Sequence, residues 1–298
     1  MFISTLLCLC LLDLQKGLNE VIAEGAKLEA VASGLKDVMA PVWTSDGKIH
    51  FLNSGDLMVM PEGSAPTVEW KLEMGPSVLA VGPGNTLFGG NALGEVFMID
   101  REGKARTVAS SVQGKRIPPI SGMAYRSDGS IYFSVRASAE QGDPARLGLY
   151  GILPNAGGAG GEAAVPPAKL LVDKGLPRGV ALSIDEKTLY FSDPEYNRVV
   201  SYELDKRGVP SNPRVVGMYR PKKEGPLGDL RSDSKGNVYC ANGDGVAVLS
   251  PDGEFIGLIP TPEPATGISW GRADGKWLFI TTKTALYRLQ TKIGWKRT

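Results

Sequence analysis

Histidine is almost absent from this sequence: His50 is the only one among 298 residues. A Ser-His-Asp triad or a metal site built from several histidines therefore cannot be assembled from residues spread along the chain. His50 itself lies in residues 48–51, whose pattern is that of a strand, and we expect its role to be structural.

Cysteine is also scarce, with three residues at Cys8, Cys10 and Cys240. Two of them lie near the N-terminus and the third lies more than two hundred residues away, which fits neither a disulfide framework nor a zinc-binding pattern. Cys240 lies in an apolar stretch that is typical of a strand. We therefore expect it to be a buried thiol without chemical function.

The chain has no excess of one charge, because 33 basic and 32 acidic residues give a net charge of +1. It has no basic stripe and no acidic tail, which argues against a nucleic-acid partner. A long hydrophobic run is missing too. Residues 3–12 are mostly apolar but too few to span a membrane, so we expect no membrane span.

Residues 3–12 do have the length of a signal-peptide core, and residues 21–23 would make a tolerable cleavage site. Against this interpretation, no lysine or arginine precedes the run. Two interpretations of residues 1–23 stay open: a signal for export, or an N-terminal extension of a cytoplasmic protein.

Glycine and proline are abundant, with 38 and 21 residues, which indicates many turns in a chain with this apolar content. Residues 176–199 show the pattern behind them: a short apolar strand, a tight turn and a second strand. This hairpin recurs six times, at intervals of 37 to 57 residues between successive turns. The turn position that favours a positive φ is occupied by Gly47, Gly84, Gly129, Glu186, Gly236 and Gly275.

A second hairpin follows most copies, so each repeat supplies about four strands over roughly 40 to 50 residues, the period of propeller blades. We therefore predict an all-β fold, a six-bladed β-propeller with four-stranded blades, formed by residues 24–298 as a single domain. Residues 27–31 have a strand pattern and are expected to pair with the last blade and close the ring.

The third repeat is the longest, and residues 137–167 are expected to be a loop insertion in its blade. The insertion contains a glycine-rich run at residues 157–161. A phosphate-binding loop would need a strand before this run and a helix after it, and the sequence shows neither.

The amino-acid sequences of the hairpins resemble those of one protein family. Ala40-Pro41-Val42-Trp43 followed by Asp46-Gly47, residues 176–199 and residues 286–289 are similar to the senescence-marker-protein, gluconolactonase and luciferin-regenerating-enzyme family. The resemblance implies a hydrolase of lactones and related esters. It also implies a divalent metal, calcium or zinc, held at the mouth of the central channel by a Glu, Asn residues and an Asp.

The sequence departs from that ligand pattern at each expected position. Met39 stands at the place of the Glu, and Ile120 and Ser121 stand at the place of an Asn-Asp pair. Arg178 stands where an Asn follows the proline of the fourth blade. In the fifth blade the expected Asp position falls on residue 227 or 228, with Asp229 beside it. A family-type metal site is therefore doubtful, and Asp229 is the one metal ligand that the pattern still offers.

We expect a gluconolactonase-type hydrolase that acts on a lactone or ester at the channel mouth. The candidate catalytic residues are Asp229, as base or remaining ligand, and Arg178, which would bind a carboxylate or an oxyanion. The candidate substrate-binding residues are Met39, Ile120, Ser121 and Thr266.

Other interpretations stay open. The propeller could be catalytically silent and bind a small anion or a protein partner, or it could resemble the arylesterase and strictosidine-synthase propellers. Arg178 could form an ordinary interblade salt bridge, and Asp229 could be a carboxylate that stabilises a turn. We expect this turn-stabilising role for Asp193 as well.

Overall fold

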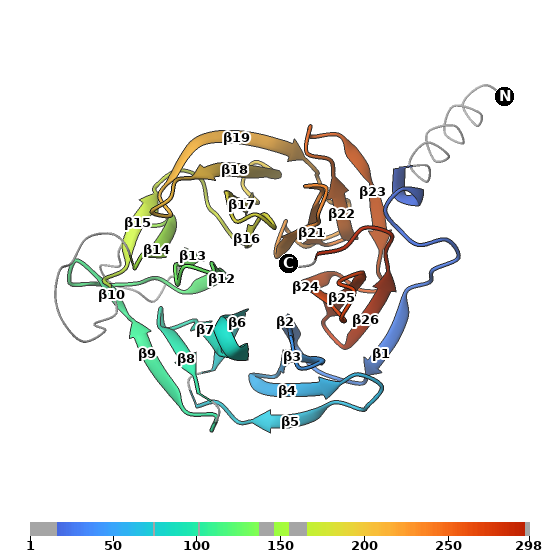
Figure 1. Cartoon of the computed structure of the whole chain (residues 1–298), viewed down its shortest axis with the longest axis horizontal. Coiled ribbons are helices and arrows are strands. Elements are labelled where there is room, and N and C mark those ends of the chain that lie inside the picture. Colours follow the sequence, from blue (N-terminus) through green and yellow to red (C-terminus); the bar gives the residue numbers. More distant parts are fainter. Residues whose placement is uncertain (1–16, 74, 101, 137–145, 155–165, 296–298) are drawn as a thin grey trace.

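The computed structural model of the chain describes residues 17–73, 75–100, 102–136, 146–154 and 166–295. Six antiparallel sheets of four strands stand around a central axis, like the blades of a propeller (Figure 1). The predicted all-β, six-bladed architecture is confirmed. The residues 3–12 that resemble a signal-peptide core lie outside the described residues.

The innermost strand of every blade is followed by its neighbours in chain order, moving outward. The strands of the first three blades are β2 (Val38–Thr44), β3 (Lys48–Asn53), β4 (Asp56–Pro61) and β5 (Thr67–Trp70); β6 (Pro76–Val81), β7 (Leu87–Asn91), β8 (Val96–Ile99) and β9 (Ala105–Ala109); and β12 (Ile120–Tyr125), β13 (Ile131–Val135), β14 (Leu149–Ile152) and β15 (Lys169–Val172). The strands of blades four and five are β16 (Val180–Leu182), β17 (Thr188–Asp193), β18 (Arg198–Leu204) and β19 (Pro210–Met218); and β20 (Leu230–Ser232), β21 (Val238–Asn242), β22 (Gly245–Leu249) and β23 (Phe255–Pro260).

Blade six closes the ring with a strand from the other end of the chain. It consists of β24 (Ala265–Gly271), β25 (Trp277–Thr282) and β26 (Ala285–Gln290), and its outermost strand is β1 (Glu29–Ser33). β1 pairs antiparallel with β26, and the Glu29 carboxylate lies 2.9 Å from the Arg288 guanidinium across the pair. The predicted closure of the ring by an N-terminal strand is confirmed.

The turns of the six hairpins have the predicted backbone conformation. All six residues at the repeated turn position have positive φ: 84° at Gly47, 61° at Gly84, 91° at Gly129, 56° at Glu186, 81° at Gly236 and 66° at Gly275. Glu186 is the one residue of these six that is not glycine. Its side chain makes the positive φ a strained backbone conformation. Its carboxylate accepts hydrogen bonds from the backbone N–H of Ser127, at 3.0 Å, and from the Ser127 hydroxyl, in the neighbouring blade.

This arrangement predicts an unusual order of stability at one position. Replacing Glu186 with alanine removes the bonds to Ser127 and keeps the strained φ, which should lower the free energy of unfolding by about 2 kcal/mol. Replacing Glu186 with glycine removes the same bonds but relieves the strain, so it should cost about 1 kcal/mol less. Urea unfolding of the three proteins checks this order. An alanine variant as stable as the glycine variant would contradict it.

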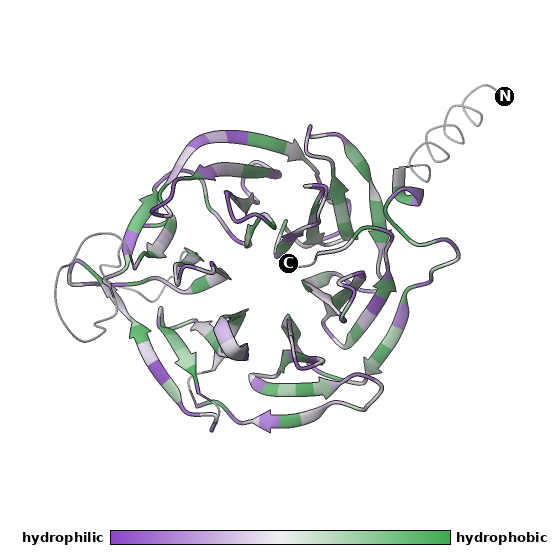
Figure 2. Ribbon diagram, in the orientation of Figure 1, coloured by the Kyte–Doolittle hydropathy of each residue, from purple (hydrophilic) through white to green (hydrophobic). Residues whose placement is uncertain are grey.

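The core lies between neighbouring sheets. Figure 2 shows hydrophobic and hydrophilic residues alternating along many strands, as expected when side chains point to opposite faces. One cluster joins Phe88 and Val96 of the second blade to Ile120 and Phe133 of the third. Because each blade buries its face against the next, the six innermost strands are held rigidly around the axis.

Two sequence-based expectations about details of the blades have different outcomes. The expectation that residues 137–167 form one loop insertion is wrong, because β14 lies within this range as the third strand of its blade. Its four residues include Gly151, and residues 155–167 after it are rich in glycine, alanine and proline, so the strand did not stand out from a loop. The glycine-rich run at residues 157–161 lies outside the described residues.

Cys240 is buried, as expected, and so is His50, for which a structural role was expected. The His50 ring lies in the first blade, with Nδ1 2.8 Å from the Glu69 carboxylate and Nε2 3.2 Å from the Thr44 hydroxyl. Burial raises the pKa of the Cys240 thiol to about 12. A thiol that stays protonated at neutral pH is a poor nucleophile, so Cys240 is not suited to catalysis.

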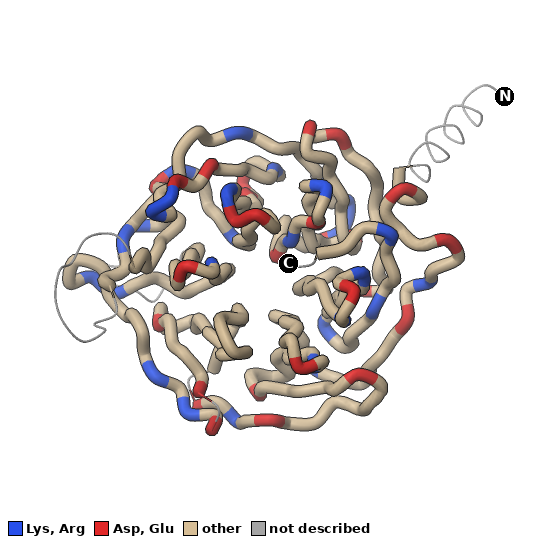
Figure 3. Tube along the Cα trace, in the orientation of Figure 1, with Lys and Arg blue, Asp and Glu red and all other residues tan. Residues whose placement is uncertain are grey.

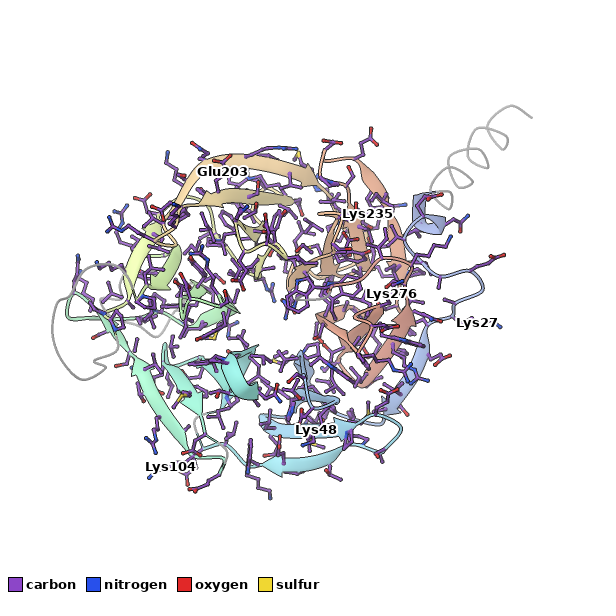
Figure 4. The ribbon with its side chains drawn as sticks, viewed as in Figure 1. Lys27, Lys48, Lys104, Glu203, Lys235 and Lys276 are labelled. Atoms are coloured by element: carbon purple, nitrogen blue, oxygen red, sulfur yellow. The ribbon has the colours of Figure 1, made fainter. Side chains whose placement is uncertain are left out.

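Charges are distributed without a dominant patch. Figure 3 shows basic and acidic positions mixed around the ring, and Figure 4 places Lys27, Lys104 and Glu203 at its outer rim. No helix in the described part of the chain is long and apolar enough to cross a membrane.

Candidate active site at the channel mouth

A cavity of about 380 Å³ opens where the innermost strands begin. Residues from all six blades line it, among them the side chains predicted from the sequence: Met39, Ile120, Ser121, Arg178, Asp229 and Thr266. A second cavity of about 150 Å³ is lined by the later residues of the same strands, such as Trp43 and Trp270. Leu79, Met123 and Arg231 line both cavities, so the two follow one another along the central channel.

Hydroxyl groups fix the loops that carry the site residues. In each of several blades a serine or threonine donates a hydrogen bond to a backbone carbonyl at the start of the next blade. The pairs are Ser77 to Ile120 at 3.1 Å, Ser134 to Arg178 at 2.5 Å, Ser192 to Gly228 at 2.7 Å and Thr266 to Val38 at 2.6 Å. The side chains at the mouth therefore project from backbone that neighbouring blades hold in place.

The close contact between blades four and five depends on glycine. A Cβ atom at Gly179 would lie 2.2 Å from the carbonyl oxygen of Gly228, which is closer than van der Waals contact allows. This contact brings Arg178 and Asp229, on either side of the junction, into the same cavity.

Asp229 reaches the cavity with its orientation fixed. Its Oδ1 accepts hydrogen bonds from the Arg231 guanidinium at 2.6 Å and from the Leu230 N–H at 2.9 Å. Its Oδ2 accepts one from the Ile268 N–H at 3.0 Å, and 21% of the side chain stays exposed. A carboxylate has about four acceptor positions, so Asp229 can still accept a hydrogen bond from a water or a substrate hydroxyl.

Arg178 lines the cavity without a partner among the described residues. Its backbone N–H donates to Ser192 at 2.9 Å, but its guanidinium forms no hydrogen bond or salt bridge with them. The expected alternative of an interblade salt bridge for Arg178 is therefore not found in the described part of the chain. The side chain is exposed to the cavity, yet burial by the surrounding protein, and then the charge of Arg136, lower the pKa of Arg178.

Sequence analysis missed two arginines of the site. Arg136 directly follows β13, and Arg231 lies in β20, two residues after Asp229. Alternation along a strand places residues two apart on the same side, so the Asp229–Arg231 pair could have been predicted from spacing. The meeting of Arg136 with Arg178 could not, because it depends on how blade three lies against blade four.

The predicted substrate-binding residues also line the cavity, where they contribute apolar surface or hydroxyls that already have partners. Ile120 is buried and Met39 is half-buried, and both contribute apolar surface. The Ser121 hydroxyl lies 3.0 Å from that of Ser134 in the same blade, and the Thr266 hydroxyl donates to Val38 of the next blade. Both hydroxyls thus have bonding partners in the fold, and their part in substrate binding stays a prediction.

Asp193 and Leu227 lie outside this cavity. Asp193 is fully buried, and its Oδ2 lies 2.9 Å from the guanidinium of Arg198. It is thus a buried ion-pair partner rather than only a turn-stabilising carboxylate. Leu227 is also fully buried and does not line the cavity.

The residues at the mouth do not fit a divalent cation. Among the described residues Asp229 is the only carboxylate that lines the cavity, and Arg231 already neutralises it. Arg136 and Arg178 add positive charge, which would repel a cation in this partly enclosed site. Among the described residues, no three His, Cys, Asp or Glu side chains are grouped so that they could hold a metal.

The comparison with known proteins agrees with the fold. Residues 40–284 match the family described as SMP-30/Gluconolactonase/LRE-like region. A gluconolactonase of Zymomonas mobilis is 24% identical over 92% of this chain and 84% of its own length. A solved gluconolactonase of Xanthomonas campestris superposes with a TM-score of 0.79 at 22% identity, with 92% of each chain covered.

A calcium-binding regucalcin of Agrobacterium tumefaciens superposes with a TM-score of 0.73 at 17% identity, covering 91% of this chain and 96% of the regucalcin. Since the family match extends over more than four fifths of the sequence, the chain belongs to the SMP-30/gluconolactonase/LRE-like family.

Proposed function

We propose that this protein hydrolyses a lactone or a related ester at the channel mouth, with Asp229 activating the water and Arg178 binding the carbonyl oxygen. The observation that carries the proposal is the meeting of these two side chains in one cavity. One is an anchored carboxylate with accepting capacity left, and the other is a guanidinium without a partner among the described residues. Family membership supports the reaction type, because related proteins are gluconolactonases.

The reaction needs a base and a group that stabilises negative charge. Asp229 accepts a proton from a water molecule while the water oxygen attacks the carbonyl carbon. Arg178 donates hydrogen bonds to the carbonyl oxygen as that oxygen becomes an oxyanion. The ring C–O bond then breaks, the leaving oxygen takes up the proton, and the product is a hydroxy acid that contains the atoms of the lactone and one water.

The surroundings suit these roles. Arg231 and the Ile268 N–H hold the Asp229 carboxylate in one orientation, so little reorganisation is needed during the reaction. Met39 and Ile120 make one side of the cavity apolar, which strengthens the interaction between Arg178 and a developing negative charge.

A pH-indicator assay of ring opening tests the proposal. Purified protein treated with a chelator is mixed with δ-gluconolactone, other small lactones or an aryl acetate, and the release of acid is compared with the spontaneous rate. We expect acceleration of at least one class. Rates equal to the protein-free control for every lactone and ester would overturn the proposal.

That negative result would favour a catalytically silent propeller that binds a small anion. The observation in favour of this second function is again Arg178, whose charge has no partner among the described residues and which lines the same cavity as apolar Met39 and Ile120. Binding of a hydroxy acid without hydrolysis of its lactone, measured by calorimetry, would identify it.

A further inference from the structure

Two guanidinium groups share the mouth cavity, and neither is paired with a carboxylate of the described residues. Arg136 follows the second strand of blade three, and Arg178 precedes the first strand of blade four. The Arg136 N–H donates to Pro119, and the Arg178 carbonyl accepts from Ser134. The first bond lies within blade three and the second joins blade three to blade four, so both backbones are held at the mouth. Neither guanidinium forms a hydrogen bond or salt bridge with another described residue.

Arg136 and Arg178 have exposed side chains without a described acidic partner, whereas several less exposed arginines are paired. The arginines with less than a third of the side chain exposed include Arg126, Arg198 and Arg231, and each is paired with an aspartate within about 3 Å. The one carboxylate that the described residues supply at the mouth, Asp229, is already bound to Arg231. Arg136 and Arg178 are thus two like charges near each other. Their repulsion raises the free energy of the ligand-free state.

A neutral lactone would not balance these charges, because its carbonyl oxygen gains negative charge only during the reaction. An ionised acid group on the substrate would balance one of them from the moment of binding. A guanidinium binds carboxylate, phosphate and sulfonate oxygens through a planar set of donors. The apolar wall of the cavity strengthens such an ion pair.

We propose that Arg136 binds an ionised acid group of the substrate, so that the preferred substrates are lactones carrying a carboxylate, phosphate or sulfonate. This inference rests on the proposed lactone hydrolysis and deepens it. Arg136 sets the specificity, whereas Arg178 and Asp229 act at the ring carbonyl.

The first arm of the test compares substrates. The ratio of kcat/KM for a charged lactone, such as 6-phosphogluconolactone or a glucarolactone, to that for δ-gluconolactone is measured in the wild type and in Arg136→Gln. We expect the wild type to prefer a charged lactone by at least ~10-fold, and the substitution to reduce this ratio by at least ~10-fold, about 1.4 kcal/mol. The matched control is Arg106→Gln, which removes the same charge from the exposed strand β9.

The second arm measures binding without hydrolysis. Glutarate, inorganic phosphate and methanesulfonate are titrated calorimetrically into the wild type, Arg136→Gln and Arg106→Gln. We expect at least one of these anions to bind, with at least ~10-fold weaker affinity in Arg136→Gln only, and to bind less tightly as ionic strength rises. The anion that binds tells which acid group the site accepts.

The two arms separate the two proposals. Anion binding that depends on Arg136, without hydrolysis of any lactone, would overturn the hydrolase and keep the acid-group site. Hydrolysis without preference for charged lactones, together with anion binding that is absent or equal in both variants, would overturn the acid-group site and keep the hydrolase.

Discussion

Replacing Asp229 with asparagine is expected to reduce kcat for lactone opening by at least ~100-fold, because the amide cannot accept the proton of the attacking water. KM should change much less, since the carboxylate acts on water rather than on the bound lactone. The substitution also removes the ion pair with Arg231, which is partly exposed, so we expect a loss of stability of about 1 kcal/mol or less. Steady-state kinetics and urea unfolding of the same preparation check both effects.

The control for this prediction is Asp185→Asn. Asp185 is an exposed turn carboxylate that accepts from Ser183 and lies outside the mouth cavity. It undergoes the same chemical change, and we expect its kcat to stay near that of the wild type. An Asp229→Asn variant with wild-type kcat would show that Asp229 only stabilises the loop before β20.

Replacing Arg178 with methionine is expected to stabilise the protein while it removes activity. The guanidinium has no described partner, and burial and Arg136 lower its pKa, so the charged form that exists at neutral pH costs folding free energy. Methionine fills a similar volume without the charge, and because solvent screens the exposed guanidinium we expect only a small gain in stability, seen as a slightly higher Tm. The loss of the oxyanion donor should lower kcat by at least ~100-fold.

Arg198→Met provides the contrast. Arg198 neutralises the fully buried Asp193 at 2.9 Å, so its removal leaves a buried carboxylate unpaired and should cost about 3 kcal/mol. The two arginine substitutions should thus change stability in opposite directions. If Arg178→Met destabilised the protein as Arg198→Met does, Arg178 would have a structural role. It would then be bound in solution to a partner that the described residues do not show.

The fold could be predicted from the sequence because its signal is local and repeated. Each inner hairpin has its turn residue at positive φ, and even Glu186 keeps the position that glycine occupies elsewhere. β14 escaped prediction because its four residues include Gly151 and precede a stretch rich in glycine, alanine and proline, a composition typical of a loop. A strand of this kind is specified by the blade into which it packs.

The site could be predicted only in part, for a different reason. Arg178 and Asp229 were found because the family resemblance marks their positions, and the cavity brings both together. Arg136 carries no such mark, and its importance depends on the junction between blades three and four. The partners of Asp229 likewise come from two blades, with Arg231 in one and the Ile268 N–H in the next.

The central claim is that arginine side chains stabilise the negative charge that develops at this mouth. The family resemblance assigns that role to a divalent cation. The most direct test is the rate of lactone opening by chelator-treated protein, followed while calcium and then zinc are titrated in. We predict a rate above the spontaneous one before any metal is added, and no rise as either metal is added. A rate that starts at the spontaneous level and increases in a saturable way with one of the metals would contradict the claim.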